Sequence, residues 1–278
     1  RWNVPAYDEA AHTGLLRHIY VRHAEATGQV LVCLVVNGER LPQEDALVDT
    51  LRKAVPGLRS VVLNTNTRRG NAVLGETMRT LWGGDAIEDI LCGLRFRISP
   101  RSFYQVNRTQ AERLYGKALA AAGLTGTETV LDLYCGTGTI GLVAARRGAA
   151  RVIGVDSVPS AIRDAANNAR HNGVENAEFV TQDATAFMKE LEASEERPQP
   201  LVLLMDPPRA GSAPEFLEAA TSLAPERIVY ISCNPATQAR DVRQLVESGY
   251  EVRAVRPVDM FPHTDHVESI VLLEKRND

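Results

Sequence analysis

The sequence predicts an α/β fold in which a seven-stranded, mostly parallel sheet over residues 101–278 follows a small α+β domain over residues 1–100. From Gln105 onward, short apolar runs alternate with segments of helical periodicity, and this rhythm is typical of a doubly wound parallel sheet. Before that point the apolar runs are β-rich and separated by turn residues, with a single helical segment. A chain of 278 residues is long enough for both domains to bury a core of their own.

The amino-acid composition is typical of an ordinary globular protein. The chain is 44% hydrophobic and 24% charged, and no apolar run approaches the ~18 residues of a membrane span, so we expect a cytoplasmic protein without a transmembrane segment. The four cysteines, Cys33, Cys92, Cys135 and Cys233, are too scattered for a metal-binding motif, and a reducing compartment suits them. We expect a monomer. Because the chain begins without Met, we also expect it to be part of a longer protein.

Charge is distributed unevenly along the chain. The net charge of −4 argues against a nucleic-acid-binding protein. Residues 1–108, however, carry 14 Lys and Arg against 11 Asp and Glu, whereas residues 109–278 carry 17 against 24. The first part is therefore the one that we expect to face a polyanion.

The small domain is predicted from β-rich runs, turn residues and one helical repeat. Leu47, Leu51 and Ala54 recur on one side of a helix, and Cys92-Gly93 provides a hairpin turn. In order, the expected elements are a hairpin of strands Leu15–His23 and Val30–Val36, a helix at Glu44–Ala54, a strand at Ser60–Asn66 and a second hairpin at Ala86–Ser99. Nothing in this domain suggests a catalytic residue.

The larger domain is predicted from the alternation of strands and helices. In order, the expected elements are a helix at Arg108–Ala122, a strand at Thr129–Tyr134, a helix that ends at Arg147, a strand at Arg151–Asp156, a helix at Pro159–Asn172, strands at Ala177–Asp183, Leu201–Asp206 and Arg227–Cys233, a helix at Pro235–Glu247, and strands at Glu251–Val258 and Glu268–Glu274. Ligands of such sheets bind at the carboxyl ends of the strands.

A glycine-rich turn, LDLYCGTGTIG, follows the first strand of this domain. Gly136 and Gly138 let a ligand approach the backbone and the free amides of the next helix. The spacing D-x-x-x-G-x-G differs from the dinucleotide-binding G-x-G-x-x-G. Asp156, at the end of the next strand, can accept hydrogen bonds from ribose hydroxyls, and Asp183 ends the strand after it, where an adenine amino group would lie. Together these features resemble the S-adenosylmethionine pocket of class I methyltransferases.

Two further strands end in a carboxylate and a thiol. DPPRAG, which begins at Asp206, resembles the [DN]-P-P-[YF] element of methyltransferases that modify base amines, but Arg209 replaces the aromatic residue and makes amine methylation the less natural chemistry. Cys233 directly precedes a helix, whose dipole we expect to favour the thiolate. Cys33 and Cys92 are interpreted instead as core residues.

A thiolate beside a methyl donor suits pyrimidine chemistry. Carbon 5 of a pyrimidine becomes nucleophilic when a thiolate adds to carbon 6, and a general base must later remove the carbon 5 proton. Glu268 is a candidate base because a carboxylate at the start of an apolar strand is costly unless it is used or paired. On composition, His263 and His266 could carry the proton equally well.

The motifs SFYQVN, DLYCGTGT, DPPRAG, SCNP and FPHTDHVE, in that order, closely resemble the RNA uracil-5 methyltransferases, which make 5-methyluridine in transfer and ribosomal RNA. The resemblance implies that Cys233 is the nucleophile and Glu268 the base. It assigns S-adenosylmethionine contacts to Gln105, Tyr134, Thr139, Asp156, Asp183 and Asp206, and makes Phe103 the platform for a flipped uracil. The GLLRHIYVRH segment resembles the ribosomal branch, so we expect 23S ribosomal RNA rather than transfer RNA as substrate.

Arginines and aromatic residues around the domain boundary are expected to hold RNA. Arg95, Arg97, Arg101 and Arg108 interleave with Phe96, Phe103 and Tyr104, a composition that suits phosphate binding and base stacking. We therefore predict that Arg95 and Arg97 contact substrate.

Three alternatives remain beside ribosomal uridine methylation. They are a transfer RNA uridine-5 methyltransferase, an RNA cytosine-5 methyltransferase, and a non-catalytic RNA-binding assembly factor that keeps the fold. Cytosine enzymes typically carry a second cysteine after the proline at the end of the fourth strand, and here Arg209 follows Pro208. The presence of Cys233, Glu268 and Asp206 together argues against an inactive factor.

Overall fold

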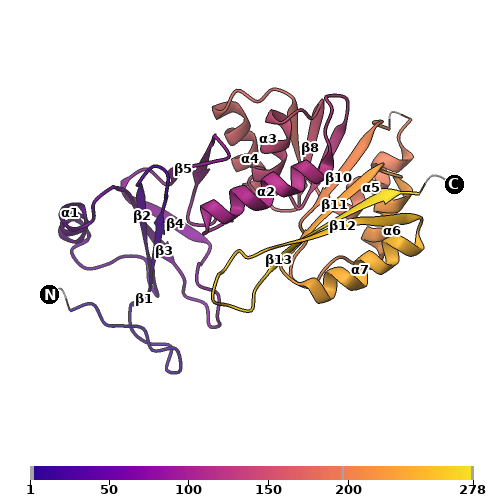
Figure 1. Cartoon of the computed structure of the whole chain (residues 1–278). Helices are drawn as coiled ribbons and strands as arrows, with labels where there is room; N and C mark the ends of the chain where they lie inside the picture. Colours follow the sequence, from indigo (N-terminus) through magenta and orange to yellow (C-terminus); the bar gives the residue numbers. More distant parts are fainter. Residues whose placement is uncertain (1–2, 196, 277–278) are drawn as a thin grey trace. The chain divides into compact units, whose positions relative to one another are not determined.

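The computed structural model describes residues 3–195 and 197–276, and the chain divides into two compact units on either side of the Ser102–Phe103 bond (Figure 1). The first unit contains a four-stranded sheet in the order β1-β2-β3-β4 and a separate hairpin of β5 and β6. Its elements are β1 (Leu16–His23), β2 (Val30–Val36), α1 (Glu44–Ala54), β3 (Leu58–Thr65), β4 (Thr77–Gly83), β5 (Ile87–Leu91) and β6 (Leu94–Ile98).

The sheet of the first unit is built around two buried parallel strands. β2 and β3 pair in parallel and are joined through α1, while β1 and β4 pair antiparallel at the two edges. Both predicted hairpins are confirmed, and the turn between β5 and β6 has positive φ at Cys92 (51°) and Gly93 (80°), as a two-residue hairpin turn requires. The interpretation of Cys92 as a core residue was wrong, because this turn leaves its side chain partly exposed. Strand β4 was not predicted, because this edge strand is largely exposed and lacks an apolar alternation.

The second unit is a seven-stranded sheet with the order β12-β13-β11-β10-β7-β8-β9. Its elements are α2 (Arg108–Ala122), β7 (Thr129–Leu133), α3 (Thr139–Arg146), β8 (Arg151–Asp156), α4 (Pro159–His171), β9 (Ala177–Thr181), α5 (Ala184–Ala193), β10 (Leu201–Met205), α6 (Pro214–Ser222), β11 (Arg227–Ser232), α7 (Pro235–Glu247), β12 (Tyr250–Val258) and β13 (Glu268–Lys275). The predicted mostly parallel, seven-stranded sheet is confirmed.

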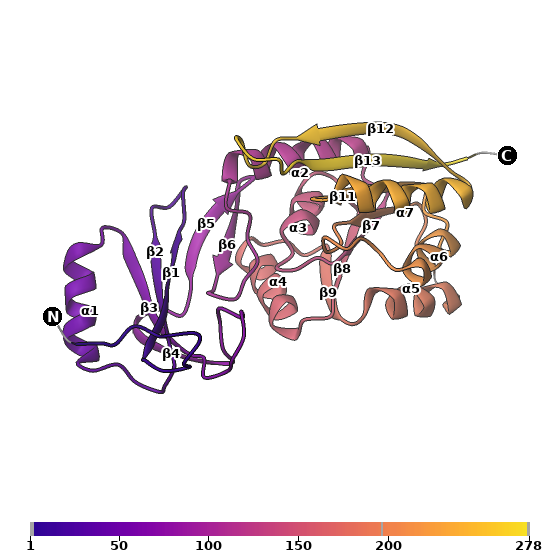
Figure 2. The same cartoon turned by 90° about the horizontal axis from the view of Figure 1, so that it is seen from below.

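Helices cover both faces of this sheet. Figures 1 and 2 show α2, α3 and α4 on one face and α5, α6 and α7 on the other. The central strands β7 and β10 are buried along their whole length, which explains their continuous apolar sequences. β13 lies between β11 and β12 and runs antiparallel to both of them. None of the helices in the described residues combines the length and hydropathy of a bilayer-spanning helix.

Candidate active site

The antiparallel register of β11 and β13 brings a thiol and a carboxylate together. Ser232 at the end of β11 pairs with Ser269 near the start of β13. Cys233 follows Ser232 in the chain and Glu268 precedes Ser269, so the two residues are neighbours at one edge of the sheet. Glu268 is 7% exposed although it is ionisable. This edge also holds the carboxyl ends of the parallel strands, where α/β proteins bind ligands.

A cavity of about 320 Å³ opens at this edge of the second unit. Its volume lies at the lower end of the range for small-ligand sites. Phe103 and Val106 stand at its rim, with 70% and 81% of their surfaces exposed. The cavity is lined by Phe103, Tyr104, Gln105, Val106, Arg209, Cys233, Phe261, His266, Val267 and Glu268.

Asn107 fixes two of the segments that line this cavity. Its side-chain amide donates to the carbonyl oxygen of Met260 at 3.0 Å, and its side-chain oxygen accepts from the amide of Gln110 at 3.2 Å. Asn107 is therefore the N-cap of α2 and also ties the segment that precedes α2 to the segment that precedes β13. Asn107 was not among the predicted site residues, although an asparagine directly before a helix is a capping signal.

The charges around Cys233 differ from the sequence-based expectation. Burial raises the pKa of the Cys233 thiol, the nearby Glu268 and Asp206 raise it further, and Arg209 lowers it. We expected the α7 dipole to stabilise the thiolate as the main effect on the pKa of Cys233. That prediction was wrong, because burial in the apolar lining and two carboxylates outweigh the dipole. Burial also raises the pKa of Glu268.

Of the two candidate histidines, only His266 lines the cavity. Its Nδ1 lies 3.2 Å from Nη2 of Arg209. Because a guanidinium has only donors, Nδ1 is the acceptor in this contact. His266 therefore contacts Arg209, and Glu268 is the buried carboxylate that lines the cavity.

The glycine-rich turn lies at the carboxyl end of β7, and its backbone is held by two carboxylates. Asp132 accepts from the amide of Gly141 at 2.9 Å, and Asp156 accepts from the amide of Gly136 at 3.0 Å. Asp132 is buried, which raises its pKa to about 7. At Gly138, where φ is 77°, a Cβ would lie 2.9 Å from the Phe179 ring, so only glycine fits there.

The remaining predicted cofactor residues line the same edge of the sheet. Tyr134 follows β7 with a positive φ of 64°, and Thr139 begins α3. The prediction that Asp183 ends a strand was wrong, because β9 ends at Thr181 and Asp183 instead caps α5 by accepting from the amide of Ala186 at 3.0 Å. Since β10, β7, β8 and β9 are neighbours in this order, the ends that carry these residues lie side by side.

The two arginines predicted to bind substrate belong to the hairpin of the first unit. Arg95 lies 3.6 Å from Glu88, and Arg97 forms an ion pair with Asp85. Both acidic partners lie in or just before β5 and reach the arginines of β6 across the hairpin. Such exposed pairs contribute little stability, so a phosphate could replace the carboxylates at small cost.

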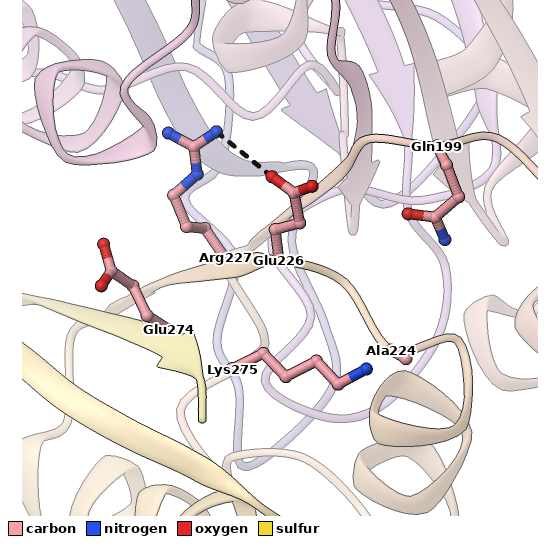
Figure 3. Close-up of a pocket in the computed structure, with 6 residues that line it drawn as sticks. All are labelled: Gln199, Ala224, Glu226, Arg227, Glu274 and Lys275. Atoms are coloured by element: carbon pink, nitrogen blue, oxygen red, sulfur yellow. Dashed lines mark ion pairs between the residues drawn. The ribbon is translucent and has the colours of Figure 1, made fainter. Parts of the chain in front are cut away.

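A larger cavity, of about 650 Å³, lies at the opposite edge of the sheet (Figure 3). It is lined by Gln199, Ala224, Glu226, Arg227, Glu274 and Lys275. Arg227 pairs with Glu226 at 3.8 Å and with Glu128 at 3.3 Å, and it also donates to a backbone carbonyl. Because its arginine already pairs with two carboxylates, we assign no ligand to this cavity. Within the described residues, no cluster of three or more His, Cys, Asp or Glu side chains could hold a metal ion.

The first testable prediction concerns Asp206. Burial, together with Glu268 and Asp132, raises the pKa of Asp206 to about 8. The folded state therefore binds a proton more tightly than the unfolded chain, and this group's contribution to stability is lost as pH rises from about 4 to about 8. Asp206→Asn should raise the free energy of unfolding by about 1–2 kcal/mol at pH values above 8. Urea denaturation at two pH values measures this, and an equal gain at a pH near 5 would contradict it.

Comparisons with known proteins identify the family. Residues 91–276 match the family model described as tRNA (Uracil-5-)-methyltransferase. The chain belongs to this family. It is 46% identical over 274 residues to an uncharacterized RNA methyltransferase of Halalkalibacterium halodurans, and a second one, from Caldanaerobacter subterraneus, is also 46% identical. These matches cover 99% and 98% of this chain but only 59% and 60% of the relatives, so the chain spans about three fifths of their length.

Solved structures support the same family and fold. The crystal structure of Pyrococcus abyssi tRNA (uracil-54, C5)-methyltransferase in complex with S-adenosyl-L-homocysteine is 32% identical, with a TM-score of 0.80 over 97% of this chain and 62% of that chain. A SAM-dependent methyltransferase from Agrobacterium tumefaciens, at 17% identity and a TM-score of 0.58 over 93% of this chain and 90% of that chain, shares the fold alone. The predicted family is thus confirmed, whereas the ribosomal branch and the roles of the site residues stay predictions.

Proposed function

We propose that this chain is the catalytic part of an S-adenosylmethionine-dependent RNA methyltransferase that methylates carbon 5 of uridine. The observation that carries the proposal is the juxtaposition of Cys233 and Glu268 in one cavity, where β11 ends and β13 begins. A nucleophile and a buried base side by side suit a reaction that needs addition to carbon 6 and removal of the carbon 5 proton.

Cys233 and Glu268 divide the reaction between them. The thiol proton passes to solvent, the sulfur of Cys233 forms a bond to carbon 6, and the electron pair of the 5,6 double bond moves to carbon 5 and oxygen 4. Bound S-adenosylmethionine supplies the methyl group that carbon 5 then takes. Glu268 removes the carbon 5 proton, the 5,6 double bond re-forms, and the sulfur leaves. Arg209, the positive group that lowers the pKa of Cys233, would favour the attacking thiolate.

The residues at the adjacent strand ends fit S-adenosylmethionine. A Cβ at Gly136 would meet no atom within 4 Å, so the turn presents open space to a ligand. Although Asp156 already accepts from two backbone amides, each carboxylate oxygen keeps a lone pair for a ribose hydroxyl. We assign the cofactor to Gln105, Tyr134, Gly136, Thr139, Asp156, Asp183 and Asp206.

The uridine must leave any base stack to reach Cys233. Phe103, exposed at the rim, provides an aromatic face on which the extruded base can stack. Ribosomal RNA is the substrate that we expect from the sequence, and transfer RNA is the second candidate because the family model and the Pyrococcus abyssi enzyme are named for it. The cytoplasmic location and the monomeric state belong to the same proposal.

Methyl transfer by the full-length protein tests this proposal. The protein is incubated with bulk RNA and S-adenosylmethionine that carries a labelled methyl group, and the digested nucleosides are separated. Labelled 5-methyluridine is expected. Labelled 5-methylcytidine would overturn the uracil assignment, and no incorporation would favour a binding factor. Mass mapping of ribosomal and transfer RNA then identifies the modified uridine.

A second prediction concerns RNA binding by the first unit. Reversing both charges, Arg95→Glu and Arg97→Glu, should weaken RNA binding by about tenfold or more at physiological salt, because two phosphate contacts are lost. The slope of log affinity against log salt should fall by about 1 to 2. Filter binding at several salt concentrations measures both. Arg243→Glu, an exposed charge reversal on α7, is the control, and unchanged affinity and slope in the double variant would refute the contact.

A further inference from the structure

The loop that follows β10 is held on α7. This loop, residues 206–212, carries Asp206 and Arg209. The carbonyl of Arg209 accepts from the side-chain amide of Asn234 at 3.1 Å and from the hydroxyl of Thr237 at 3.3 Å. Asn234 is the N-cap of α7 and directly follows Cys233. The first turn of α7 therefore fixes the Arg209 backbone relative to Cys233.

Arg240, one turn further along α7, holds the rest of the loop. Its Nη2 donates to the carbonyls of Ala210 and Ser212, both at 3.2 Å. Between them, Gly211 has a φ of 79°, and a Cβ there would lie 2.6 Å from Arg240 Nη2. The loop therefore packs too closely on the Arg240 guanidinium for any larger residue at position 211.

The Asp241 carboxylate joins the loop, β11 and α7 to one another. Its side chain is 1% exposed and accepts from Nε and Nη2 of Arg240 at 2.8 and 2.6 Å. It also accepts from the amide of Ser212 and from the hydroxyl of Tyr230, both at 2.7 Å. A buried carboxylate with four donors from the loop, from β11 and from its own helix sets their mutual geometry. Asp241 itself does not line the Cys233 cavity.

We propose that Asp241 is a positioning residue which, with Arg240, clamps the 206–212 loop to α7 and so keeps the Arg209 guanidinium beside the Cys233 sulfur. The role of the Cys233 sulfur as a nucleophile rests on the proposed function. The charged and titratable groups around Cys233 are Glu268 from β13, Asp206 from the end of β10, Arg209 from the loop, and His266, which lines the same cavity and contacts Arg209. Arg209 is the side chain among them that lowers the pKa of Cys233, so a shift of the loop after loss of the clamp weakens the charge that favours the thiolate.

The pH dependence of Cys233 alkylation tests the clamp without RNA or cofactor. The native protein is treated with iodoacetamide over a range of pH, and peptide mass spectrometry follows Cys233 separately from the partly exposed Cys92, which serves as an internal control. Asp241→Asn should move the midpoint of Cys233 alkylation to higher pH, in the direction of Arg209→Gln. At neutral pH the rate should fall about threefold to tenfold, because only the thiolate reacts.

Two arginine variants distinguish an effect on the position of Arg209 from an effect on the stability of the protein. Arg240→Lys keeps the charge on a side chain that is 59% exposed, but a single ammonium cannot replace the fork that joins Asp241 to both carbonyls. It should shift the Cys233 midpoint even if Asp241→Asn does not fold. Arg243→Lys, also exposed on α7 and paired with Glu247, should change nothing. Midpoints of Asp241→Asn and Arg240→Lys that equal the wild-type value, whatever their melting temperatures, would overturn the clamp. Absence of an adduct between the wild-type protein and RNA that contains 5-fluorouridine would instead overturn the proposed function alone.

Discussion

Glu268→Gln is expected to stall the protein as a covalent adduct with RNA. The amide keeps the shape of the side chain but cannot accept the carbon 5 proton, so addition and methylation proceed while release of the sulfur is blocked. With full-length protein, S-adenosylmethionine and substrate RNA, a band that resists denaturant and contains both protein and RNA should accumulate. Turnover should fall by about 10²-fold or more, which is the usual contribution of a general base.

The cavity provides a control for this variant. His266→Gln changes a side chain that also lines the cavity and contacts Arg209, but the proposal gives it no part in proton removal. It should turn over without a stalled adduct. If His266→Gln accumulates the adduct and Glu268→Gln does not, the base has been assigned to the wrong residue.

Cys233→Ala is expected to abolish both the adduct and methyl transfer. Without the sulfur, carbon 5 of uracil stays too weak a nucleophile, and activity should fall by at least about 10³-fold, as for the loss of other covalent nucleophiles. RNA that contains 5-fluorouridine offers a second measurement, because fluorine cannot leave as a cation and the wild-type protein should be trapped on it.

The same variant should bind RNA nearly as well as the wild type, since a half-buried thiol contributes little to a largely phosphate-driven affinity. Cys92→Ala, in the turn between β5 and β6, is the matched control and should keep full activity. An adduct that survives in Cys233→Ala would show that another group is the nucleophile.

Local sequence patterns were sufficient to predict most helices and strands. The elements and contacts that they missed have physical explanations. β2, β10 and β11 are buried strands whose unbroken apolar runs identify them. β4 is an exposed edge strand with no such pattern, and it was missed. The acidic partners of Arg95 and Arg97 could not be predicted from the sequence, because the fold of the hairpin brings Glu88 and Asp85 to them.

The sequence by itself determined most of the strands, their succession along the chain and the glycine-rich turn, because these depend on residue type and on periodicity over a few positions. Only the tertiary structure decided that β13 runs antiparallel beside β11 in the register that pairs Ser232 with Ser269. That register makes neighbours of Cys233 and Glu268, which are 35 residues apart in the chain. The structure also decided the protonation of the site, since the pKa values of Cys233 and Asp206 depend on burial and on carboxylates from other strands.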